Sequence, residues 1–98
     1  MSVYVIGHAR ITDQGAFAKY AEAGLKATQQ AGGKLIAASS GTQTVMEGEQ
    51  FKDGGIVIIE FPSLEAYKRF YHGKAYGDAR KLRKDACKLD IVVVDGVD

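Results

Sequence analysis

The chain has 98 residues, a length that allows one compact domain over residues 1–98 but not two. Its composition, 46% hydrophobic and 26% charged, is that of a folded globular protein and excludes a disordered chain. Thirteen basic and twelve acidic residues leave a net charge of +1, which gives no support for a protein dedicated to nucleic acid or to an anionic membrane surface.

The cysteine count and the N-terminal sequence narrow the class further. A single cysteine, Cys87, excludes an intramolecular disulfide framework. The first residues carry no basic region, and no apolar run approaches the roughly 20 residues that a membrane span needs. We therefore expect a soluble, cytoplasmic domain with no membrane partner.

The first half of the chain predicts a strand, a helix and two further strands. Residues 2–11 alternate with period two, which indicates a strand, and Asp13 can cap a helix that ends at Gly32 and Gly33. A second strand is expected over 34–38, resuming over 42–47 after a bulge or bend at Gly41. A turn over 48–55 then leads into the β-branched strand 56–61.

The second half predicts one interrupted helix and a last strand. Ser63 can cap a helix whose apolar positions run to about Lys88, with an interruption at His72 and Gly73. Residues 89–94 are again β-branched and indicate a strand.

The resulting order is β-α-β-β-α-β, which predicts a ferredoxin-like α+β fold. Two right-handed βαβ units place both helices on one face of a four-stranded antiparallel sheet. The other face is left uncovered although several of its side chains are apolar, so we expect a second copy of the chain to pack there, sheet on sheet.

Several short motifs, spread over nearly the whole chain, resemble one known family. They are Tyr4-Val5-Ile6, Tyr20, Gly32-Gly33-Lys34, Glu47-Gly48, Glu60-Phe61-Pro62-Ser63, Tyr71, Tyr76, Leu82-Arg83 and Val94-Asp95-Gly96-Val97. Together they resemble the uncharacterised family called domain of unknown function 1330, within the dimeric α+β barrel superfamily. The resemblance implies a homodimer whose two sheets enclose a barrel-like interior. It implies no reaction, because the superfamily ranges from cofactor-independent monooxygenases and isomerases to ligand-binding regulatory modules.

His8 is the first candidate for chemistry. Strand alternation places it opposite Gly7 and Ala9, so that it faces the space between two sheets if the small side faces the helices. Its imidazole suits proton transfer, and we expect Glu60 to lie near the same end of the sheet and to orient it as a catalytic pair. The alternative is a histidine that serves only packing.

Candidate ligand-binding residues come from the last predicted helix and from the second strand. Tyr76, Arg80, Arg83 and Cys87 follow helical spacing, and an arginine fork with a tyrosine hydroxyl can hold a small anionic or carbonyl ligand. Alternatively, Arg83 pairs with Asp78, Asp85 or Glu47 and only fixes the helix. The candidate ligand-binding residues are therefore Tyr76, Arg83, Glu47 and Tyr71, although Tyr71, like Tyr20, also suits core packing.

Other classes of function lack their motifs. The strand 55–61 carries no stacking aromatics before its last residue, which argues against RNA binding, and one cysteine with two histidines argues against a metal site. No phosphate-binding glycine motif appears, so we expect no cofactor. Two hypotheses stay open. The first is a homodimer that binds a small molecule in a cavity between sheet and helices or between the two sheets, with possible cofactor-independent monooxygenase- or isomerase-like chemistry. The second is a non-catalytic structural or ligand-binding regulatory dimer.

Overall fold

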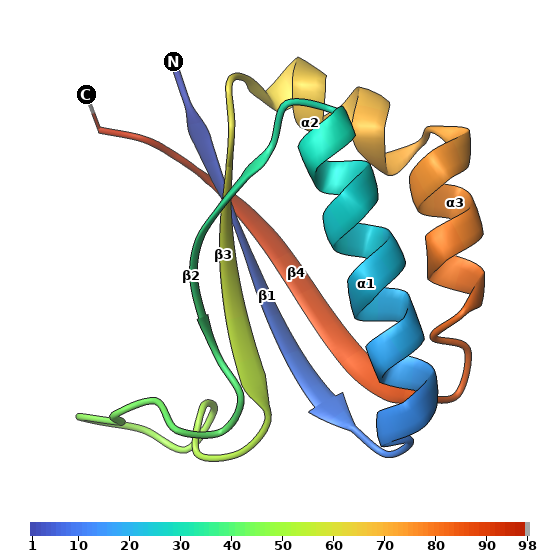
Figure 1. The fold of residues 1–98 in the computed structure, drawn as a ribbon. Helices are drawn as coiled ribbons and strands as arrows, with labels where there is room; N and C mark the ends of the chain where they lie inside the picture. The colour runs from blue at the N-terminus through green and yellow to red at the C-terminus, as the bar shows by residue number, and fades with distance from the viewer. Residues whose placement is uncertain (98) are drawn as a thin grey trace.

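The computed structural model describes residues 1–97, which form one sheet covered on one face by helices (Figure 1). The strands are antiparallel and lie in the order β2-β3-β1-β4, which confirms the predicted ferredoxin-like α+β fold. In chain order the elements are β1 (Val3–Ile11), α1 (Gln14–Gln30), β2 (Lys34–Ser39), β3 (Gly55–Phe61), α2 (Leu64–Tyr71), α3 (Lys74–Lys81) and β4 (Cys87–Asp95).

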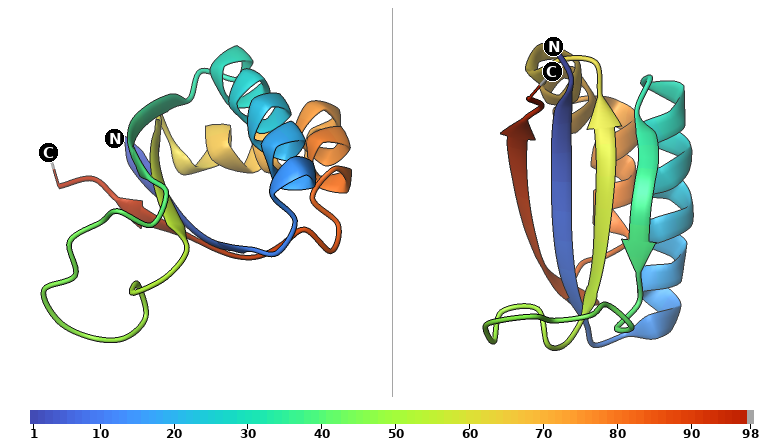
Figure 2. Two further views of the ribbon diagram at one scale, coloured as in Figure 1. Left: turned by 60° about the horizontal axis from the view of Figure 1, so that its bottom comes forward. Right: turned by 90° about the vertical axis from the view of Figure 1, so that its left-hand side faces the viewer.

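The central strand β1 separates two different faces. Its residues Val5, Gly7 and Ala9 are buried on the side of the helices, as the alternation predicts. The intervening residue Ile6 lies beside Ile58 of β3 and Val92 of β4 on the opposite face. No helix of the described residues covers that opposite face, which we call the open face (Figure 2).

Helix α1 begins and ends where the capping residues indicate. The Asp13 carboxylate accepts a hydrogen bond from the backbone N–H of Ala16, and Gly32 adopts a positive φ of 88° after the last turn. Gly33 then passes close to Phe61, because a Cβ at Gly33 would lie only 2.7 Å from that ring. The helix end is thereby fixed against the sheet.

The second helical segment is shorter than predicted. Ser63 caps α2 and the helix is interrupted at His72 and Gly73, both as expected, but α3 ends at Lys81, not near Lys88. The expected helix would continue past Asp85, which instead has a positive φ of 62° and turns the chain into β4. The two predicted helices are therefore three, all on the same face.

The segment between β2 and β3 also differs from the prediction. Residues 42–47 form no strand, and the long connection over residues 40–54 is a loop that extends away from the sheet on the side opposite the helices (Figure 2). Gly41, Gly48 and Gly54 all have positive φ, which breaks the extended backbone that a strand needs. Of the predicted bulge or bend at Gly41, the structure has the bend, whereas the irregularity in the strand pairing lies earlier, between Leu35 and Ala37.

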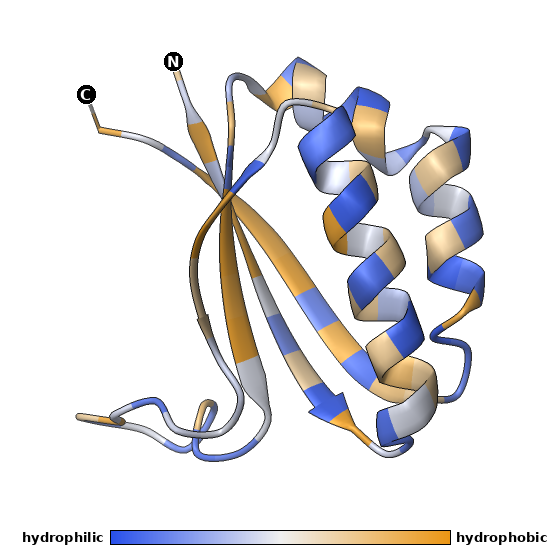
Figure 3. Ribbon diagram, viewed as in Figure 1, coloured by the Kyte–Doolittle hydropathy of each residue, from blue (hydrophilic) through white to orange (hydrophobic). Residues whose placement is uncertain are grey.

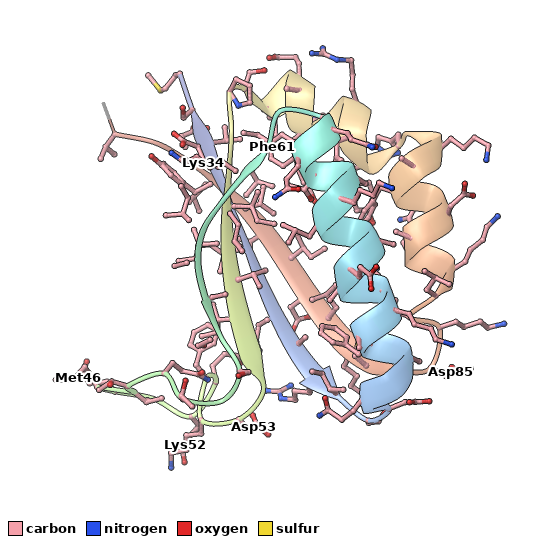
Figure 4. The ribbon with its side chains drawn as sticks, in the orientation of Figure 1. Lys34, Met46, Lys52, Asp53, Phe61 and Asp85 are labelled. Carbon is pink, nitrogen blue, oxygen red and sulfur yellow. The ribbon has the colours of Figure 1, made fainter. Side chains whose placement is uncertain are left out.

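The hydrophobic core lies at the end of the sheet where α2 crosses it. Phe61 is fully buried there, between the sheet and the helices in Figure 4, and its ring packs edge-on against Tyr67 at 5.3 Å. Val3 and Val5 complete the buried cluster. Strands β3 and β4 are hydrophobic along much of their length, whereas hydrophilic and hydrophobic residues alternate along the helices (Figure 3). None of the helices in residues 1–97 is both long and apolar enough to span a bilayer.

Candidate functional site

A cavity of about 680 Å³ lies between the sheet and the helices. The sheet contributes small and branched side chains to its walls, and α1 contributes one face. The apolar residues that line it include Val5, Ala9, Phe17, Leu35, Val57, Ile59, Leu89 and Ile91. Because Gly7 and Gly24 carry no side chain where the sheet and α1 face each other, the two layers leave room between them.

Polar residues also line the cavity, among them Arg10, Gln14, Ser39 and Asp53. Two tyrosines in its wall belong to a further polar group, which we call the Tyr20–Tyr76–Arg83 cluster. Tyr20 of α1 and Tyr76 of α3 both line the cavity, and their hydroxyl oxygens are hydrogen-bonded at 2.8 Å. Nη1 of Arg83 donates to each of the two hydroxyl oxygens at 3.0 Å. The guanidinium also lies over the Tyr20 ring, 5.0 Å from its centroid.

Burial and the close hydroxyls set the protonation of this cluster. Burial raises the pKa of Tyr20 well above its ordinary value, and the hydrogen bond between Tyr20 and Tyr76 adds to that rise. Burial acts to lower the pKa of Arg83, but the two tyrosine oxygens outweigh it and the pKa is raised. Tyr20 is therefore neutral and Arg83 is charged at neutral pH.

Arg83 lies behind the two hydroxyls and does not line the cavity. It lines a depression on the outer surface together with Arg80 and the lysines of α3 and the following turn. Arg80 stacks over the ring of Tyr71, 4.7 Å from its centroid. Tyr71 itself does not line the cavity, so the structure places it beside the cluster as a packing residue.

The alternative in which Arg83 pairs with Asp78, Asp85 or Glu47 is not seen among the described residues. Asp78 pairs instead with Lys74 at 2.8 Å, and Glu47 lies exposed in the loop 40–54, away from the cluster. Cys87 opens β4 and does not continue the helix, so the expected helical row of four residues is also wrong. Sequence analysis missed Tyr20 as a member of the site, since its position only indicated a core face.

His8 lies on the open face, where the loop covers it. Only 3% of its surface is exposed, its Nε2 is 2.8 Å from the carbonyl oxygen of Asp53, and its ring packs edge-on against Phe51. Its Nδ1 is buried without a hydrogen-bond partner among the described residues. In this single chain the loop therefore separates His8 from solvent.

The expected pair of His8 and Glu60 is not formed. The strand register places Ile56 opposite His8 and Glu60 opposite Tyr4, whose hydroxyl lies 3.5 Å from that carboxylate. Because Glu60 lies level with Tyr4, its backbone is four residues along the strand direction from that of His8, about 13 Å at roughly 3.3 Å per residue. Catalytic roles for His8 and Glu60 individually stay predictions.

The described residues contain no arrangement of side chains that suits a metal ion. Within residues 1–97, no group of three or more histidine, cysteine or carboxylate side chains is arranged to hold a metal ion. The polar atoms that do meet near the cavity are hydroxyls and a guanidinium, which suit hydrogen bonding to a ligand and not metal binding.

Solved structures of low sequence identity share the fold. A protein of unknown function from Rhodopseudomonas palustris is 18% identical, with a TM-score of 0.82 over 99% of this chain and 83% of that one. A dimeric ferredoxin-like protein of unknown function from Jannaschia sp. is 14% identical, with a TM-score of 0.69 over 98% of this chain and 100% of that one. A cofactor-independent oxygenase from Streptomyces nogalater is 7% identical, with a TM-score of 0.63 over 99% and 94% of the two chains.

The sequence comparisons agree with the resemblance seen in the motifs. No curated protein matches this chain in sequence. A family model does match, and it covers residues 2–97. The chain therefore belongs to the family described as Domain of unknown function (DUF1330).

Proposed function

We propose that this protein binds a small, largely apolar molecule in the cavity between the sheet and the helices. The observation that carries the proposal is the cavity itself, about 680 Å³ of space with largely apolar walls and a few polar groups, including the Tyr20–Tyr76 pair. Ligand sites typically have volumes of about 300–1,000 Å³, with mostly hydrophobic linings and a few polar groups that fix orientation. The cavity has these properties.

The polar cluster also suits chemistry on a bound ligand. Hydroxyl and guanidinium groups in an apolar, water-poor site stabilise developing negative charge more strongly than they do in water. The fold is shared with a cofactor-independent oxygenase, so monooxygenase- or isomerase-like chemistry without a cofactor is the enzymatic form of this proposal. A non-catalytic ligand-binding dimer is the alternative, and turnover of a bound ligand separates the two.

The binding proposal can be tested with 2-ethylnaphthalene, a purely apolar fluorescent probe. We expect saturable binding by the wild-type protein. Gly24 lines the cavity, and a Cβ there meets only the Tyr20 ring at 3.8 Å, so Gly24→Leu places a side chain in the space of the probe. Gly77 of α3 lies on the outer surface with nothing within 4 Å of a Cβ, which makes Gly77→Leu the matched control.

The outcome of that titration decides the proposal. We expect Gly24→Leu to weaken binding at least tenfold, whereas Gly77→Leu leaves it unchanged. Absence of binding by the wild-type protein, or equal binding by both variants, contradicts a ligand site between the sheet and α1.

We further propose that two copies of the chain pair through their open faces. This face presents Ile6, Ile58 and Val92 side by side on three neighbouring strands, and Val92 is 49% exposed in the single chain. Contiguous exposed apolar side chains of this kind mark interaction surfaces. The dimeric protein from Jannaschia sp. shares the fold, which supports a second copy as the partner.

The oligomeric state measured by sedimentation tests this second proposal. Val92→Lys places a charge in the middle of the open face and is expected to convert the dimer to a monomer. Val97 is fully exposed beyond β4, so Val97→Lys adds the same charge away from the face and should leave the dimer intact. A monomeric wild-type protein, or a dimer that survives Val92→Lys, contradicts pairing through this face.

A further inference from the structure

The Tyr20–Tyr76–Arg83 cluster contains two hydroxyl protons, and each of them needs an acceptor. Each tyrosine hydroxyl has one proton to donate and can accept hydrogen bonds, whereas a guanidinium only donates. Nη1 of Arg83 donates to both hydroxyl oxygens, so neither hydroxyl can donate to Arg83. The cluster therefore holds two hydroxyl protons and must place both of them elsewhere.

Only one of those protons has an acceptor within the cluster. The two hydroxyl oxygens lie 2.8 Å apart, so one hydroxyl donates to the other. The second hydroxyl is the acceptor of that bond and keeps its own proton. No other acceptor is bonded to either hydroxyl among residues 1–97, so this second proton is uncommitted. The count holds whichever tyrosine is the donor.

The surroundings of the two rings offer no substitute acceptor. Tyr76 is only 4% exposed, and its ring packs against Phe70 at 4.8 Å. Tyr20 packs against Phe17, and Arg80 adds a second positive charge over the Tyr76 ring. Aromatic rings and cations do not accept a hydrogen bond as an oxygen does. Both tyrosines line the cavity, whereas neither lines the outer surface depression beside Arg80 and Arg83.

We infer that the ligand of this cavity carries a hydrogen-bond-accepting oxygen, a carbonyl or an oxyanion, which receives the uncommitted hydroxyl proton of the Tyr20–Tyr76–Arg83 cluster. The inference rests on the proposed binding function and names the class of ligand for that site. An uncommitted buried donor costs free energy unless an acceptor meets it, so the cavity favours ligands that bring one.

The positive charge of the cluster narrows the range of polar groups that the ligand can carry. Arg83 lies behind the hydroxyls and stays positively charged, so it polarises them toward the ligand oxygen. This arrangement favours an oxygen that carries or gains negative charge, as in a ketone, a carboxylate or a phenolate. It disfavours an ammonium ion next to the cluster, because that ion would face a hydroxyl proton with the positive charge of Arg83 behind it. The cavity is therefore suited to aromatic or aliphatic carbonyl compounds and acids.

The direct test uses 2-acetylnaphthalene and needs no variant. Its carbonyl stretching frequency falls when the oxygen accepts a hydrogen bond. We expect the bound probe to absorb at lower frequency than the same ketone dissolved in an alkane. An unshifted band in the bound probe overturns the inference, whereas the binding itself still supports the cavity.

A thermodynamic test compares two probes on two proteins. Tyr20→Phe/Tyr76→Phe removes both hydroxyls and should weaken 2-acetylnaphthalene by about tenfold, the loss expected for one buried hydrogen bond and its unpaired carbonyl. The affinity of the double variant for 2-ethylnaphthalene should stay within twofold of the wild-type value, which shows that the cavity is intact. Tyr4→Phe removes a hydroxyl on the open face and is the matched control, with both probes unchanged.

A third probe, 2-naphthoate, separates carbonyl from oxyanion ligands, and the three probes together separate the inference from the function on which it rests. Tighter binding of 2-naphthoate than of 2-acetylnaphthalene, lost in the double variant, identifies an oxyanion, and the reverse order identifies a neutral carbonyl. Equal loss of both naphthalenes in the double variant overturns the inference, as does no loss of either. No binding of any naphthalene by the wild-type protein overturns the proposed function together with the inference.

Discussion

Replacing Gly24 by alanine should stabilise the protein. Gly24 lies in the interior of α1 and lines the cavity, and a Cβ built there meets nothing closer than the Tyr20 ring at 3.8 Å. Glycine is a poor helix former because its unfolded backbone has more freedom to lose. An alanine methyl at this site also covers apolar surface at the cavity wall.

The size of the effect follows from these two contributions. Glycine to alanine in a helix interior gains about 0.8–1.0 kcal/mol from propensity alone. Burying the added methyl against the Tyr20 ring adds up to about 0.8 kcal/mol. We therefore expect the free energy of unfolding to rise by about 1–2 kcal/mol, or Tm by roughly 4 °C or more for a domain of this size.

Urea denaturation at fixed protein concentration measures this change, and Gly77→Ala is the control. Gly77 lies in α3 with nothing within 4 Å of a Cβ, so its alanine should gain the propensity contribution without the buried methyl. A smaller gain at Gly24 than at Gly77, or a loss of stability, would refute the reasoning, since it would mean that the space between α1 and the sheet is filled.

Three further changes test other parts of the structure. Gly33→Ala should destabilise the protein by about 1–3 kcal/mol, because its Cβ would lie 2.6 Å from the Thr28 methyl and 2.7 Å from the Phe61 ring. A urea denaturation curve identical to that of the wild-type protein would contradict this close approach. Burial raises the pKa of Tyr67 to about 12, above the value of roughly 10 expected in the unfolded chain, so the stability that this tyrosine contributes should be complete below pH 10 and fall as the pH rises toward 12. Tyr67→Phe should flatten that alkaline decline in urea denaturation, and an unchanged slope would show that another group causes it. His8→Ala should cost about 1–3 kcal/mol and expose the loop 40–54 to proteases, because the ring packs against Phe51 and bonds to the Asp53 carbonyl; a variant as stable and resistant as the wild-type protein contradicts this role.

Much of the fold could be predicted because local patterns and tertiary packing agree. The alternation of β1 specifies which side chains face the helices, and the Asp13 and Ser63 caps mark where α1 and α2 begin. Each of these signals concerns neighbouring residues, and the sheet register preserves them. The family resemblance over residues 2–97 was likewise visible in short motifs spread along the chain.

The errors occurred where long-range contacts decided the local structure. Residues 42–47 have the composition of a strand, but positive φ at Gly41 and Gly48 and the bonds of Gln43 across the loop hold them out of the sheet. The sequence from Arg83 to Lys88 suits a helix, but residues 83–86 form a turn and β4 begins at Cys87, which pairs with Ile11 of β1. Neither constraint leaves a periodic signal in the sequence.

The candidate site was predicted only in part for the same reason. Tyr76 and Arg83 were selected by their chemistry, but Tyr20 lies 63 positions from Arg83 and meets it only because α1 packs beside α3. Opposite charge indicated carboxylate partners for Arg83, whereas the structure surrounds it with aromatic rings and hydroxyls. Strand alternation identified the face on which His8 lies but carries no information about the loop that covers it.

A crystal structure of the protein with 2-acetylnaphthalene bound tests the central claim most directly. We expect the naphthalene rings between the sheet and α1, with the carbonyl oxygen within hydrogen-bond distance of the Tyr20 or Tyr76 hydroxyl. A probe found on the open face, or in the surface depression beside Arg80, would contradict a ligand site in the cavity between the sheet and the helices.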